Sequence, residues 1–93
     1  MNRVEMIDRI LKEKLGAEHV GIIDASHKHK GHKSGGGGHF SLVVVSPQFE
    51  NVNLIDRVRM VYTALDEQIN KEPKEIHALQ IKTYTPEQWN KMN

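Results

Sequence analysis

Apolar residues recur along the chain at spacings that predict both helices and strands. Over residues 3–15 they stand three or four positions apart with charged residues between them, which predicts an amphipathic helix ended by Gly16. Residues 19–26 and 39–46 are rich in β-branched residues and predict two strands, with Pro47 ending the second. Helical spacing returns after Asn53, a predicted N-cap, and indicates one long helix reaching residue 69.

The C-terminal part predicts a third strand and a short last helix. In the strand 76–83, strict alternation places His77, Leu79 and Ile81 on one face. Thr85, followed by a proline and by Gln88, has the spacing of a capping box. The resulting order, α-β-β-α-β-α, predicts a single α+β domain with a three-stranded mixed sheet. The first two strands should be antiparallel, the last two parallel through a right-handed crossover, and the helices should cover one face.

Composition narrows the chemistry that this chain can perform. The 93 residues suit one small domain, and a net charge of +1 confines any attraction for nucleic acid to a local patch. Cysteine is absent, so the chain forms no disulfide and offers no thiolate, and its metal ligands must be His, Asp or Glu. No apolar run approaches the roughly 20 residues that span a membrane. Without a signal-like segment, a cytoplasmic location and no membrane partner are expected.

Residues 27–38, rich in histidine, lysine and glycine, predict a flexible loop between the first two strands. Neutral imidazoles in this loop could bind a transition metal, although a glycine-rich loop does not hold ligands in place. The glycines Gly35 to Gly38 lead into a strand and not into a helix, which argues against a phosphate-binding loop. No nucleophile with a base and no paired carboxylates come together, so the sequence indicates no enzyme.

Basic side chains offer a second kind of chemistry. Lys28, Lys30 and Lys33 lie in the loop, and Arg57 and Arg59 lie near the start of the long helix. Such residues can contact phosphates of a nucleic acid. With five aromatic residues in the chain, no stacking platform accompanies them.

Three stretches taken together resemble the BolA-like family, over about residues 4–89. They are "DASHKHKGHKSGGGGHFSLVVVSPQFE", "LIDRVRMVYTAL" and "IHALQIKTYTPEQW". The resemblance implies one BolA-like domain over residues 1–93 with a fold similar to the type II KH fold. It also implies a non-enzymatic partner of a monothiol glutaredoxin, which shares a [2Fe-2S] cluster for iron–sulfur cluster assembly, delivery or iron sensing.

The resemblance assigns roles to particular histidines. His77 matches the family's histidine of the third strand, in "IHAL", and becomes an expected iron ligand. A second ligand is expected from the loop, where His29 is favoured over His32 and His27 is a spare. His39 matches the start of the second strand and is expected to be structural. The partner's cysteine and a bound glutathione would complete the cluster, with no cofactor in the isolated chain, which would be a monomer or a weak homodimer.

The family offers DNA-binding transcriptional regulation as an alternative, through a helix-turn-helix-like segment around residues 49–70. Here the chain departs from the family pattern. Many members have Arg-His-Arg where this chain has Arg57, Val58 and Arg59. The Gly-x-x-Gly loop with which KH domains clamp nucleic acid is also missing between the predicted helices.

Overall fold

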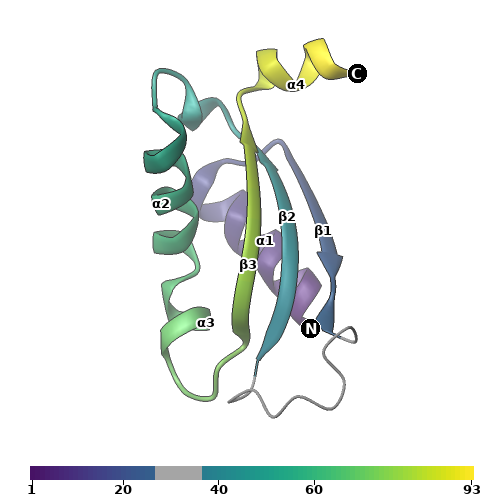
Figure 1. Ribbon diagram of the computed structural model, residues 1–93, viewed down its shortest axis with the longest axis vertical. Coiled ribbons are helices and arrows are strands. Elements are labelled where there is room, and N and C mark those ends of the chain that lie inside the picture. The colour runs from purple at the N-terminus through teal and green to yellow at the C-terminus, as the bar shows by residue number, and fades with distance from the viewer. Residues whose placement is uncertain (27–36) are drawn as a thin grey trace.

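The computed structural model of the chain describes residues 1–26 and 37–93, in which three strands form one sheet (Figure 1). The elements are α1 (Arg3–Leu15), β1 (His19–Asp24), β2 (Gly38–Val45), the 3-10 turn η2 (Pro47–Phe49), α2 (Leu54–Ala64), α3 (Asp66–Asn70), β3 (Ile76–Tyr84) and α4 (Pro86–Met92). This order confirms the predicted α+β architecture, with one extra helical turn, α3. None of the helices in the described ranges is both long and apolar enough to cross a membrane.

The sheet has the predicted topology. Its strand order is β1-β2-β3, with β1 antiparallel to β2 and β2 parallel to β3. The crossover from β2 to β3 runs through α2 and α3, and α1 crosses behind the sheet (Figure 1). Because β2 and β3 are parallel, their first residues meet at one end of the sheet, and this end carries the site described below.

Alternate residues of β2 supply the centre of the hydrophobic core. Phe40, Leu42 and Val44 are at most 2% exposed and pack against one face of α1 and α2. The core also contains Ile7, Leu11 and Leu15 of α1, Val61, Ala64 and Leu65 of the α2 region, Phe49 of η2 and Ile76 of β3. Each large side chain buried in this way contributes about 1.5–3 kcal/mol to stability. The predicted caps are present, since Asn53 accepts a hydrogen bond from the Asp56 amide and Gly16 adopts a left-handed conformation.

The prediction of one long helix after Asn53 is wrong. Helix α2 ends at Ala64, Leu65 has φ −102° and ψ 16°, and α3 continues in a separate turn. The break keeps Leu65 fully buried while Ile69 is half-buried at the edge of the core. Leu54, the first residue of α2, lies outside the apolar face that packs on the core. It is 65% exposed, because the first turn of α2 does not pack on the core.

Helix α4 does not share the face that α1 and α2 cover. Val45 is 1% exposed but points away from the main core, since its neighbour Val44 faces inward. His19 and Tyr84 are its register partners on β1 and β3. Trp89 of α4 stacks on His19 at 4.9 Å between ring centroids and lies 5.6 Å from the Tyr84 ring. The expectation of helices on one face therefore holds for α1 and α2, and α4 covers one end of the opposite face.

Gly38 is a glycine because the start of β2 leaves no room for a side chain. A Cβ atom there would lie 2.7 Å from two ring carbons of Phe40 and 2.7 Å from the Ser26 hydroxyl. We expect Gly38→Ala to lower the free energy of unfolding by about 1–3 kcal/mol through overpacking. Urea denaturation followed by circular dichroism measures the loss. Gly21→Ala is the matched control in β1, since its Cβ would meet neighbours at 3.6 Å, an ordinary contact. Equal stabilities of the two variants would contradict the expected overpacking.

Candidate metal centre

His77 occupies an irregular position at the start of β3. In the register of β2 with β3, Gly38 pairs with Ile76 and His39 pairs with Ala78, so that His77 is the extra residue of a β-bulge. Strict alternation would have turned His77 towards the helices with Leu79. The bulge instead gives the core position to Ile76, which is 1% exposed, and leaves His77 exposed. The predicted sharing of one face by His77, Leu79 and Ile81 is therefore wrong for His77.

The end of the glycine run makes this bulge possible. Gly37 has φ +89°, a conformation that favours glycine, and a Cβ there would lie 3.0 Å from the His77 backbone nitrogen. The Gly38 amide donates a hydrogen bond to the Glu75 carbonyl at 3.1 Å. The predicted loop therefore ends one residue early, because Gly38 already belongs to β2. The lack of a side chain at Gly37 lets the backbone before β2 approach Ile76 and His77.

His39 is fixed beside His77 by hydrogen bonds to its own backbone. Its amide donates to the Ser26 hydroxyl at 3.0 Å, and its carbonyl accepts from the Ala25 amide at 2.8 Å. Ser26 is held in turn, because its amide donates to the Asp24 carboxylate at 2.9 Å. The His39 and His77 rings lie 5.0 Å apart between centroids, with their planes tilted by 45°. Two imidazoles from neighbouring strands thus meet at one end of the sheet.

The remaining histidines of the predicted ligand set, His29, His32 and the spare His27, lie outside the described residues, as do Lys28, Lys30 and Lys33. Among residues 1–26 and 37–93, no group of three or more His, Asp or Glu side chains could surround a metal ion. The described part of the chain therefore contributes a pair of imidazoles and not a complete coordination sphere.

Arg57 does not match the predicted role of a phosphate contact. Its side chain is buried, with the residue 6% exposed. Its Nε donates to the Val52 carbonyl at 2.8 Å, its Nη1 donates to Gln88 Oε1 at 2.9 Å, and its guanidinium lies 5.8 Å from the Phe49 ring centre. Gln88 also accepts from the Thr85 amide in the capping box of α4. Arg57 thus joins α2 to α4 inside the protein, which corrects its assignment to a nucleic-acid surface.

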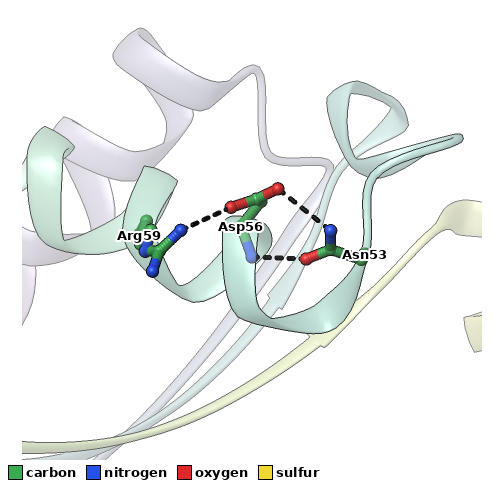
Figure 2. Close-up of polar contacts among 3 residues, drawn as sticks. All are labelled: Asn53, Asp56 and Arg59. Atoms are coloured by element: carbon green, nitrogen blue, oxygen red, sulfur yellow. Dashed lines mark hydrogen bonds and ion pairs between the residues drawn. The ribbon is translucent and has the colours of Figure 1, made fainter.

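Arg59 remains on the surface, but an acid accompanies it (Figure 2). Its Nη1 lies 3.0 Å from Asp56 Oδ1, and the two side chains are 75% and 50% exposed. Asn53 holds the same carboxylate through its amide nitrogen at 3.0 Å and caps the helix by accepting from the Asp56 amide at 2.8 Å. The charges of Arg59 and Asp56 cancel, so that the start of α2 is not a basic patch.

His39 is the site residue that sequence reasoning assigned to a merely structural role. A signal was present, since His39 is the first residue of the predicted strand 39–46 and His77 is the second residue of the predicted strand 76–83, and the two strands were predicted to be parallel. Neighbouring parallel strands begin at the same end of a sheet, so the sequence could have placed these two histidines close together. The predicted alternation concealed the contact, because it turned His77 to the other face.

Comparison with known proteins gives a consistent result. A family model described as BolA-like protein matches residues 11–88. Protein BOLA2 of Arabidopsis thaliana is 44% identical over 86 residues, which cover 91% of this chain and 81% of that protein. The DNA-binding transcriptional regulator BolA of Haemophilus influenzae is 30% identical over 93 residues, covering 100% of this chain and 86% of the relative. The solved BolA domain of SufE1 from Arabidopsis thaliana superposes with a TM-score of 0.78 at 30% identity, covering 94% and 95% of the two chains.

Proposed function

The chain belongs to the BolA-like family, and from that premise we propose that it is a non-enzymatic partner of a monothiol glutaredoxin. In this function the two proteins hold one [2Fe-2S] cluster between them, for cluster assembly, delivery or iron sensing. The observation that carries the proposal is the exposed imidazole of His77, which the β-bulge turns out of the core at the start of β3. An exposed ligand at a strand end can reach a cluster that another molecule also binds.

The metal ligands that this chain offers fit a cluster shared with a second protein better than a cluster bound by this chain alone. A [2Fe-2S] cluster takes four protein-type ligands, commonly thiolates. This chain has no cysteine, and its described residues hold no group of three candidate ligands. The missing thiolates would come from the partner's cysteine and from glutathione. His77 would supply one imidazole, and the second would come from the loop, with His29 favoured over His32.

Imidazole ligation would give such a cluster properties suited to transfer. Replacing thiolate by neutral imidazole raises the reduction potential of a [2Fe-2S] centre. Imidazole must also be neutral to bind iron, so that acid competes with ligation. The chain's own contribution is to present His77 on a strand held by the sheet, where the ring can approach a partner without unfolding any element.

The glutaredoxin hypothesis predicts that His77→Ala removes the shared cluster. The chain is mixed anaerobically with a monothiol glutaredoxin, glutathione, ferrous iron and sulfide, and visible absorption and circular dichroism are recorded. The original chain should give a heteromeric spectrum distinct from that of the glutaredoxin alone. His77→Ala should lose this spectrum or shorten its lifetime, because one iron ligand is missing.

His19→Ala is the matched control. His19 is also an exposed strand histidine, but it stacks on Trp89 at the end of the sheet away from His77. It should form the cluster as the original chain does. An unchanged spectrum and lifetime in His77→Ala would contradict the ligand assignment. Failure of the original chain to form any heteromeric cluster would contradict the function itself.

DNA binding is a second candidate function, favoured by the name of the Haemophilus influenzae relative, a DNA-binding transcriptional regulator. Of the two arginines that were predicted to contact DNA, Arg57 is buried and does not present its side chain to a phosphate. Arg59 is exposed, but Asp56 offsets its charge. The candidate then depends on Arg59 together with the loop lysines Lys28, Lys30 and Lys33.

A further inference from the structure

We propose that His39 and His77 together bind one divalent transition-metal ion, such as Zn²⁺, in the isolated chain. The separation of the rings fits this use. In a tetrahedral site each metal–nitrogen bond is about 2.0 Å and each ring centre lies about 1.1 Å beyond its nitrogen, which places two ring centres about 5 Å apart. The observed distance between the centroids of the His39 and His77 rings is 5.0 Å. The planes of these two rings are tilted by 45°, so the rings are not stacked as those of His19 and Trp89 are, at 20°.

Both ligands of this pair stand on regular structure. The backbone of His39 is bound through its amide and its carbonyl to Ser26 and Ala25, and it also lies in the ladder with β3. His77 is placed by a bulge in β3, and a Cβ at the neighbouring Gly37 would lie 3.0 Å from the His77 backbone nitrogen. Metal sites bind well when their ligands are held close to the bound geometry by rigid elements. The pair meets this requirement through the sheet, without depending on the placement of the loop histidines.

The surroundings of the pair leave room for further ligands of the ion. His77 is exposed, and the register partner of His39 is Ala78, whose methyl group fills little space. A hollow of about 340 Å³ next to His39 is also lined by Ala25, Phe40, Ser41, Ala78, Leu79 and Gln80. Water molecules can therefore complete the coordination of a metal held by two imidazoles. Imidazole ligands suit zinc, copper, nickel and iron, and they disfavour calcium and magnesium, which take oxygen ligands.

Zinc titration of the isolated chain tests the pair. Because the loop carries three further histidines, the starting protein is the full chain with His27→Ala, His29→Ala and His32→Ala, and calorimetry measures its affinity for Zn²⁺. Cobalt absorption provides a second readout, since tetrahedral coordination gives intense visible bands. Removing a residue that only hydrogen-bonds to a metal ligand lowers the metal affinity by about 10- to 100-fold. Removing a ligand itself should cost at least as much. His39→Ala or His77→Ala, each added to the starting protein, should therefore weaken binding by about tenfold or more.

His19→Ala in the same background is the control and should leave the affinity unchanged. Binding of one ion that depends on both His39 and His77 is the expected result. No binding by the starting protein, or equal binding after either substitution, would overturn the proposal. Because His77 is exposed, His77→Ala should keep the fold, and far-ultraviolet circular dichroism checks this.

Zinc binding by the pair needs neither a glutaredoxin nor a cluster, so its failure is distinguishable from failure of the proposed function. A chain that binds zinc through both histidines but forms no heteromeric cluster would retain the metal site and lose the partnership. The reverse result would retain the partnership and overturn the metal site.

Discussion

Phe49→Ala should be the most destabilising of the substitutions considered for this protein, lowering the free energy of unfolding by about 3–5 kcal/mol. Phe49, the last residue of the η2 turn, is 0% exposed, and its ring packs in the core. Ser46 fixes that turn, because its hydroxyl donates to the Leu15 carbonyl and accepts from the Gln48 amide at 3.0 Å. The neighbouring backbone is thus held in place and cannot collapse into the cavity that the alanine leaves, which favours the upper part of the range.

The total stability of a domain of this size makes the loss easy to measure. At about 0.05–0.15 kcal/mol per residue, the whole domain is stable by roughly 5–14 kcal/mol. Each kcal/mol lost should lower Tm by about 4–8 °C. Urea and thermal denaturation measure both quantities. Leu54→Ala is the control, since Leu54 is 65% exposed in the first turn of α2, and its effect should stay within about 0.5 kcal/mol. Comparable losses in the two variants would refute the assignment of Phe49 to the core.

Arg57→Ala should lower the free energy of unfolding by about 3 kcal/mol, the lower end for the loss of two hydrogen bonds to a charged group at about 1.5–3 kcal/mol each. The substitution removes the donors to the Val52 carbonyl and to Gln88 Oε1, and it uncovers the ring of Phe49. Arg59→Ala is the matched control two residues away. Its ion pair with Asp56 is exposed to solvent, so its loss should cost at most about 1 kcal/mol.

The same two variants decide how DNA binding can be tested. A loss of DNA binding in Arg57→Ala would report on stability and not on a phosphate contact, since the side chain is buried. Arg59→Ala is the fair test, and a real phosphate contact should reduce the slope of log affinity against log salt by about 0.9. An unchanged slope would remove Arg59 from the DNA candidate. Equal stability of Arg57→Ala and the original chain would contradict the structural role of Arg57.

The environments of Arg57 and Arg59, two positions apart in α2, could not be told apart from the sequence. Arg57 and Arg59 are alike in charge, and the helical period places them on different faces of α2 without saying which face is buried. Burial of Arg57 became possible because Val52, Phe49 and Gln88 surround it, and Gln88 is distant in sequence. The predicted phosphate contact is wrong for Arg57 for this reason.

The sequence alone determined the features that depend on neighbouring residues. The caps at Asn53 and Thr85, the stop at Gly16 and the order of helices and strands follow from interactions a few positions apart. The absence of cysteine restricted the ligands to imidazole and carboxylate, and the family motif singled out His77.

Only the tertiary structure decided the features that depend on contacts between distant segments. The bulge that exposes His77 lies where Gly37 allows the backbone before β2 to approach the start of β3, and the pairing of β2 with β3 brings His39 to His77. A register shift of one residue changes the face of a side chain without changing the hydrophobic pattern that a sequence displays. The identity of the candidate ligand was therefore readable from the chain, while its exposure and its neighbour were set by the packing of one strand against another.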